Sequence, residues 1–316
     1  FENAMRVLLA IGGSTNGIVH LAAIAGRVGL EIDMAALDRM ARETPVLLDL
    51  KPSGQHYMED FHHAGGMATL LRELKPLLRL DALTVTGRTL GEEIDRAGPG
   101  FAQDVVRTLA HPIYPQGGLA VLQGNLAPGG ALIKVSAADA RLMEHTGRAV
   151  VFDDLEDLAA RIDDEALEVH ADDVLVLRRI GPKGAPGMPE AGYIPIPRKL
   201  ARAGVKDMLR LSDGRMSGTA FGTIVLHITP ESAVGGPLAL VRDGDLIRLS
   251  VAHRELSLLV PDAELAQRAS DHPVVVPTAD RGYRKLFLQS VLPADRGVDF
   301  DFLQAAQFTG KTPRAR

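Results

Sequence analysis

The chain has 316 residues, of which 46% are hydrophobic and 24% charged, and its formal net charge is −5. This globular composition is large enough for two hydrophobic cores, and its mildly acidic balance predicts that nucleic acid is not a partner. No apolar run approaches the roughly 20 residues of a membrane helix, and Glu2 is atypical of a signal peptide. We therefore expect a cytoplasmic protein with no membrane partner.

The first third of the chain has the apolar spacing of helices. We expect helices over residues 1–11, 15–29, 33–45 and 55–78. Asp33 is placed as a helix cap, and the paired glycines at 12–13 and 65–66 should interrupt the helical pattern. Residues 83–98 predict a short strand, a turn and a helix.

From Pro112 onward, short apolar runs alternate with glycine-rich turns. Strands are predicted within 117–136, 148–152, 172–181, 223–232, 237–251 and 255–260. The pair Asp243-Gly244 carries a hairpin signal. Many short strands with few helices indicate a closed or nearly closed β structure that begins near residues 105–115.

The stretch "IGGSTNG" places Ser14, Thr15 and Asn16 after a glycine turn, at the start of a helix. Hydroxyl groups and free N–H groups at such a position suit an anion such as a carboxylate. The alternative is that Ser14 or Thr15 only caps the helix and binds nothing.

The stretch 50–66 contains His56, His62, His63, Glu59 and Asp60. His56 and Asp60 stand four residues apart, which on a helix favours a salt bridge over a metal site. Since His56 directly follows a "PSG" turn, contact with a substrate is a further interpretation.

Two glycine-rich loops carry the strongest candidates. "IGPKGAPGMPE" ends on Glu190, where a hard cation would find an oxygen ligand, although a solvated loop explains the same residues. "LSDGRMSGTAFG" holds Ser217, which is either part of a polar turn or a reactive hydroxyl that a cation or aimed N–H groups would activate. A helix and a strand are predicted between Glu190 and Ser217, which would bring both loops to one end of the β structure.

These motifs occur together with "LKPSGQHYMED", "GGLAVLQGNLAPGGALIKVS" and "PESAVGGP", and the set resembles the dihydroxy-acid and sugar-acid dehydratase family over nearly the whole chain. "SDGRMSGTAFG" and the tail 281–303 are similar to the pentonate branch, the L-arabinonate and D-xylonate type. The resemblance implies an α/β fold. Residues 1–110 would be the mostly helical end of an N-terminal α/β domain that bears the cluster. Residues 111–316 would be a β-barrel-like C-terminal domain flanked by helices, with a C-terminal tail.

The resemblance also implies the chemistry. Members remove water from a 2,3-dihydroxy acid, and the resulting enol tautomerises to a 2-keto-3-deoxy acid. An iron–sulfur cluster of the 2Fe-2S type acts on the C3 hydroxyl, and Mg²⁺ holds the carboxylate and the C2 oxygen. By the match, Ser217 is the base at C2, Glu190 is a Mg²⁺ ligand, and Thr219 contacts substrate. Ser14, Thr15, Asn16 and His56 would bind or brace the substrate.

Members of the family are homodimers or homotetramers, and the cluster cysteines lie in a region that precedes the matched part. The absence of cysteine and of an initiator methionine predicts a C-terminal portion that is inactive as a dehydratase by itself. Three alternatives stay open: a dihydroxy-acid dehydratase of branched-chain amino-acid synthesis, a non-catalytic sugar-acid-binding domain, and elimination driven by Mg²⁺ alone.

Overall fold

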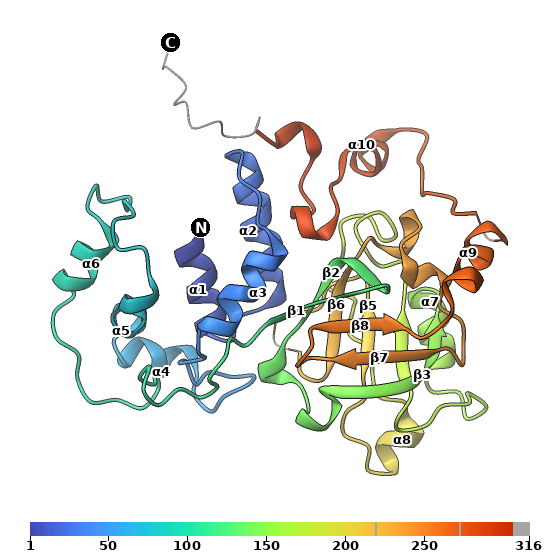
Figure 1. Cartoon of the computed structure of the whole chain (residues 1–316), viewed down its shortest axis with the longest axis horizontal. Coiled ribbons are helices and arrows are strands. Elements are labelled where there is room, and N and C mark those ends of the chain that lie inside the picture. Colours follow the sequence, from blue (N-terminus) through green and yellow to red (C-terminus); the bar gives the residue numbers. More distant parts are fainter. Residues whose placement is uncertain (219, 272, 306–316) are drawn as a thin grey trace.

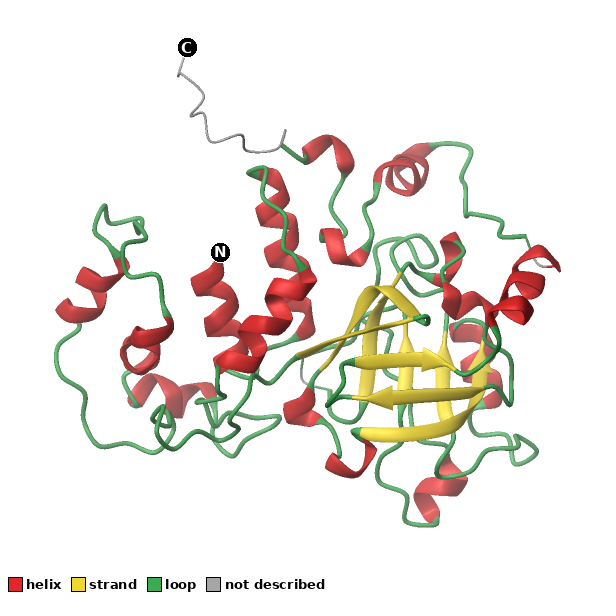
Figure 2. Ribbon diagram, in the orientation of Figure 1, coloured by secondary structure: helices red, strands yellow, loops and turns green. Residues whose placement is uncertain are grey.

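The computed structural model describes residues 1–218, 220–271 and 273–305. A group of helices forms the N-terminal part and a closed barrel forms the rest (Figures 1 and 2). The helices of the first part are α1 (Glu2–Ala10), α2 (Thr15–Arg27), α3 (Met34–Glu43), α4 (Met58–His63), α5 (Gly66–Leu74) and α6 (Leu90–Arg96).

Side chains cap several of these helices as the sequence predicts. Ser14 accepts a hydrogen bond from the backbone N–H of Asn16, and Asp33 accepts from the N–H groups of Ala35 and Ala36. Such bonds satisfy N–H groups that have no partner within the helix. The expected helices over 1–11, 15–29 and 33–45 are confirmed, the second and third with side-chain caps.

The barrel closes in the strand order β1-β2-β6-β5-β4-β3-β7-β8. Its strands are β1 (Ala120–Gly124), β2 (Ala127–Ile133), β3 (Glu144–Phe152), β4 (Val174–Leu177), β5 (Arg210–Ser212), β6 (Ile224–Thr229), β7 (Leu246–Ser250) and β8 (Glu255–Leu258). The remaining helices are α7 (Leu155–Arg161), α8 (Arg198–Arg202), α9 (Asp262–Asp271) and α10 (Gly282–Ser290). The predicted β-barrel with flanking helices is confirmed.

Alternation along β4 shows how the barrel is filled and covered. Val174 and Val176 belong to the core inside the barrel, whereas Leu175 and Leu177 pack outside it with residues of α7. Successive side chains of a strand point to opposite faces, so an all-apolar strand is buried on both sides.

Strands β3, β4, β5 and β6 run parallel to one another. The carboxyl ends of parallel strands meet at one edge, so the segments that follow these strands emerge at the same end of the barrel. This arrangement confirms the expectation that the loops bearing Glu190 and Ser217 share one end.

The helical part packs directly on the barrel. Leu119, Val121 and Leu132 join a core that they share with side chains of α1, α2 and α3. A half-buried ion pair between Arg254 and Asp38, 2.7 Å long, also joins α3 to the β7–β8 connection. The predicted boundary between parts at residue 110 is tested by none of these contacts and stays a prediction.

Two local expectations are wrong. Residues 83–89 form no strand, because only one isolated bridge joins Leu83 to Thr89 around a turn. Asp243-Gly244 is a turn but closes no hairpin: the residues before it form a 3₁₀-helix, η5 (Pro237–Leu240), which begins at a proline. The hairpin lies one connection later, between β7 and β8.

Among the residues that the structure describes, none of the helices has the length and apolar character needed to cross a membrane.

Candidate active site

The candidate site lies at the end of the barrel where β4 and β5 finish. The loop after β4 carries Glu190 and the loop after β5 carries Ser217. The backbone N–H of Gly192 donates to the carbonyl of Arg215 over 2.7 Å, so the two loops contact each other directly.

The side chain of Asn16 joins three segments of the chain. Its amide nitrogen donates to a carboxylate oxygen of Glu190 over 2.6 Å and to the carbonyl of Met216 over 3.0 Å. Its amide oxygen is buried without a hydrogen-bond partner among the described residues. Asn16, at the start of α2, thus fixes both Glu190 and the residue before Ser217.

The glycine after Ser217 permits a close approach to the same helix. A methyl group on Gly218 would lie 2.9 Å from both Cβ and Oγ of Ser14, closer than such atoms can pack. The hydroxyl of Ser14 already accepts the capping bond from Asn16 N–H. Ser14 therefore caps the helix, and it also forms the surface against which the Ser217 loop packs. Substrate contact by Ser14 and Asn16 stays a prediction.

Glu190 and Ser217 line one open cavity of about 490 Å³. Glu190 is exposed and Ser217 is partly buried, so both can meet a ligand that enters from solvent. Lys206, Tyr193 and Phe221 lie in the same wall. This volume falls within the range of small-molecule sites in proteins.

A buried ion pair forms the base of this wall. Arg210, only 2% exposed, pairs with Asp207 over 2.6 Å and donates to the carbonyl of Ile194 over 2.9 Å. Asp207 in turn accepts from both the N–H and the hydroxyl of Thr223. The pair therefore ties the loop after Glu190 to the end of the loop after Ser217.

Two buried carboxylates hold the loop after β4 in place by accepting hydrogen bonds from its backbone. Asp213 accepts from the N–H of Ile180 and from the N–H and hydroxyl of Ser232. Glu231 accepts from the N–H groups of Lys183 and Gly184. Burial raises the pKa of both carboxyls, because desolvation penalises their charged forms.

Other predicted residues lie apart from this cavity or outside the described chain. His56 precedes α4 and lies 3.9 Å from Asp60, as the salt-bridge interpretation expects, and it does not line the cavity. Thr15 is buried in the first turn of α2. Thr219 lies outside the described residues. Substrate contact by His56, Thr15 and Thr219 stays a prediction.

Comparison with known proteins shows the family to which the chain belongs. The family model "Dihydroxy-acid/6-phosphogluconate dehydratase C-terminal" matches residues 104–298, and the N-terminal model of the same family matches residues 1–93. The chain belongs to the dihydroxy-acid/6-phosphogluconate dehydratase family.

Curated members of this family are similar over nearly the whole chain. An L-arabonate dehydratase from Azospirillum brasilense is 49% identical over 96% of this chain and 53% of its own length. A 6-deoxy-6-sulfo-D-gluconate dehydratase from Pseudomonas putida is 50% identical over 98% of this chain and 54% of its own length. A dihydroxy-acid dehydratase from Methanothrix thermoacetophila is 41% identical over 94% of this chain and 54% of its own length. The chain thus spans about half the length of these relatives.

The oxygen atoms at the site fit a magnesium ion. The Glu190 carboxylate is exposed and lines the cavity, and Mg²⁺ takes oxygen ligands from one or two carboxylates, completed by water and substrate. Within the described residues, no group of three or more His, Cys, Asp or Glu side chains could hold a metal. The chain has no cysteine, so its residues do not fit a thiolate-held iron–sulfur cluster.

Sequence reasoning missed the Arg210–Asp207 pair and Lys134. Lys134 directly follows β2 and is buried, which lowers the pKa of its amine. Two residues on, Ser136 packs against Gly12 of the turn before Ser14. A charged residue beside or within an otherwise apolar strand was the available signal at 134 and 210.

Proposed function

We propose that the protein carrying this chain dehydrates a 2,3-dihydroxy sugar acid to a 2-keto-3-deoxy acid, with Ser217 as the base at C2. The observation that supports this most is the pair of hydrogen bonds that the Asn16 side-chain amide donates. It holds the candidate metal ligand Glu190 and the carbonyl preceding Ser217 against one helix start. Glu190 and Met216, which lie 174 and 200 positions from Asn16 in the sequence, are thereby held by one side chain.

The chemistry requires a strong base next to a cation. The proton on C2 is weakly acidic, so its removal is assisted when a positive charge lies close to the carboxylate and C2 oxygen. In our proposal Glu190 would hold Mg²⁺, which would supply that charge, and the Asn16 amide nitrogen positions the Glu190 carboxylate. Ser217 Oγ, as the alkoxide, takes the C2 proton, and the C2–C3 double bond forms as the C3–O bond breaks. The departing hydroxide takes the proton back from Ser217 and leaves as water, which restores the alkoxide, and the enol tautomerises to the keto acid.

The iron–sulfur cluster of the family would need ligands outside these residues. With no cysteine in the chain, we propose that the cluster, of the 2Fe-2S type, is held elsewhere in the assembled protein. A homodimer or homotetramer in the cytoplasm is the assembly we propose.

A substrate panel tests this function. The intact protein carrying this chain, supplied with iron, sulfide and Mg²⁺, is assayed for 2-keto acid formation from pentonates, hexonates and a branched 2,3-dihydroxy acid. Turnover of a pentonate or hexonate supports the proposal. Turnover of the branched acid alone would instead assign the protein to amino-acid synthesis, and binding without turnover would favour the sugar-acid-binding domain.

A further inference from the structure

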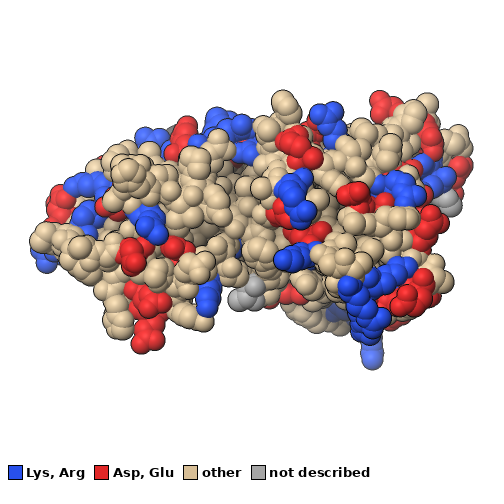
Figure 3. Space-filling view, turned by 90° about the horizontal axis from the view of Figure 1, so that it is seen from below, with Lys and Arg blue, Asp and Glu red and all other residues tan. Residues whose placement is uncertain are grey.

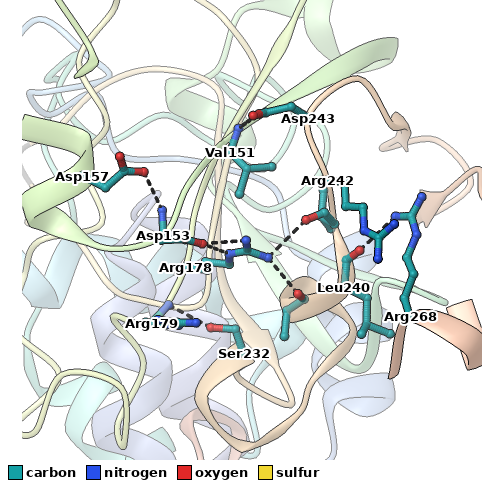
Figure 4. Close-up of polar contacts among 12 residues, drawn as sticks. Val151, Asp153, Asp157, Arg178, Arg179, Ser232, Leu240, Arg242, Asp243 and Arg268 are labelled. Carbon is teal, nitrogen blue, oxygen red and sulfur yellow. Dashed lines mark hydrogen bonds and ion pairs between the residues drawn. The ribbon is translucent and has the colours of Figure 1, made fainter. Parts of the chain in front are cut away.

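A second cavity, of about 650 Å³, opens at the same end of the barrel but is lined by different residues. Its wall is built from the ends of β3 and β4, from η4 (Ser232–Val234) and η5, and from the segment 273–277. Figure 4 shows the polar contacts around this wall. Neither Glu190 nor Ser217 lines it.

Two of the four arginines in this wall are already neutralised. Arg178 pairs with Asp153 over 2.6 Å and donates to backbone carbonyls of the η5 region. Arg268 pairs with Asp245 over 2.5 Å and with Glu264 over 2.6 Å. These two side chains build the wall and have little charge left for a ligand.

The other two, Arg179 and Arg242, are exposed. Over the part of the chain that the structure describes, neither guanidinium has an ion pair or a hydrogen bond, although the backbone N–H of each is engaged. The remaining carboxylate of the wall, Asp271, accepts from Gln267 over 2.7 Å. Two guanidinium groups without an ion pair among the described residues therefore line the same cavity, together with Asp271, whose neutral partner leaves its negative charge in place.

Arg178 and Arg179 are neighbours in the sequence, yet both line this cavity, and the backbone of Arg179 is strained. Successive residues of an extended chain point to opposite sides. Arg179 has a φ of 61°, the left-handed conformation that non-glycine residues rarely adopt, and its N–H is held by the Ser232 hydroxyl over 2.8 Å. Gly184 allows the next loop to cross closely, because a methyl group there would lie 2.6 Å from the Arg179 carbonyl. Such strain persists only where surrounding contacts impose it, and it clusters at ligand-binding sites.

We propose that this cavity binds the phosphate group of a small phosphate ester, with Arg179 and Arg242 as its ligands. Guanidinium groups match the oxygens of a phosphate in pairs, and two of them balance its two negative charges. The cavity is larger than one phosphate ion, and Val274, Val275 and Pro277 supply an apolar wall for the organic part of the ester.

Calorimetric titration of the intact protein tests this site, with inorganic phosphate, glucose 6-phosphate and glucose as the probes. We expect one saturable site per chain that binds glucose 6-phosphate more tightly than phosphate and does not bind glucose. The double variant Arg179→Gln/Arg242→Gln should lose roughly tenfold or more in affinity, because charge-assisted hydrogen bonds are removed. The single variant Arg242→Gln, at a residue with ordinary backbone geometry, should lose part of it.

A matched control variant distinguishes binding by these two arginines from a general effect of removing two positive charges from the protein. Arg96→Gln/Arg284→Gln removes the same two charges from exposed helix positions outside the cavity and should leave the affinity unchanged. Equal losses in the two double variants, or no saturable binding of either phosphate compound, would overturn the proposal. Equal affinity for phosphate and glucose 6-phosphate would overturn its assignment to an ester.

Discussion

Asn16 is the residue on which the candidate site depends most. From the sequence we expected Ser14, Thr15 and Asn16 to meet an anion or the substrate, with the alternative that Ser14 or Thr15 only caps the helix. In the structure Ser14 is the cap, whereas the Asn16 side chain reaches Glu190 and the Met216 carbonyl. Local spacing predicts a cap because capping partners are two or three residues away, but it holds no information on partners so distant in sequence.

Asn16→Asp should separate this role from simple packing. The change removes both donors and places a second carboxylate beside Glu190, so we expect a loss of about 2–3 kcal/mol in the free energy of unfolding and a large fall in turnover. Asn125→Asp is the matched control, because Asn125 also makes two hydrogen bonds, to the backbone of Leu258. It should lower the denaturation midpoint without lowering turnover. If Asn16→Asp keeps wild-type turnover, Asn16 does not organise the site.

Asp213 predicts a pH dependence of stability. Burial raises its pKa in the folded state, so the folded form holds the proton more tightly than the unfolded form. The contribution of this group to stability is therefore complete below its unfolded pKa, and it is lost as pH rises through the folded pKa. Denaturant unfolding of the wild type and of Asp213→Asn from pH 4 to 8 measures it. The stability of the wild type relative to the variant should fall as pH rises, and a constant difference would contradict the assignment.

At the scale of elements, the parallel strands β4 and β5 bring the two site loops together. This could be predicted, because a helix and a strand between Glu190 and Ser217 return the chain to the same end of a barrel. The Arg210–Asp207 pair that ties the loops could not be. In the sequence, "KDMLRL" reads as a strand with charges at its ends, and only the closed barrel shows that Arg210 is buried under Tyr193.

Arg210→Lys should lower turnover by more than its loss of folding stability alone would explain. A lysine keeps the charge but cannot bond Asp207 and the Ile194 carbonyl with one planar group, so the two loops lose their fixed relation. We expect a fall in kcat of roughly tenfold or more with a smaller change in KM, since misplaced catalytic groups affect the reacting step most.

The control is Arg268→Lys, which alters another buried ion pair of the barrel away from Ser217. It should lower the denaturation midpoint by a similar amount while kcat stays unchanged. Hydrogen exchange of residues 186–196 and 213–218, which needs no activity, should quicken only in Arg210→Lys. If both variants change kcat and exchange alike, the Arg210 pair is only structural.

At the scale of the whole molecule, two parts supply the candidate site together. Asn16 comes from the helical part and Glu190 and Ser217 from the barrel, and the shared core fixes one against the other (Figure 1). On the face drawn in Figure 3, basic and acidic side chains stand interspersed. The family and barrel were predictable because long motifs specify them. The packing of the helical part on the barrel could not be predicted, because its contacts join residues far apart in the chain.

The most direct test of this account is the turnover of Ser217→Ala in the intact protein, with iron and magnesium contents measured beside it. Ser212→Ala is the control, since Ser212 ends β5 just before the same loop and its hydroxyl accepts from the Gly214 N–H. We predict that Ser217→Ala retains the metals and substrate binding but loses turnover by roughly 10²-fold or more, while Ser212→Ala stays active. Turnover by Ser217→Ala near the wild-type rate would contradict the assignment of Ser217 as the base.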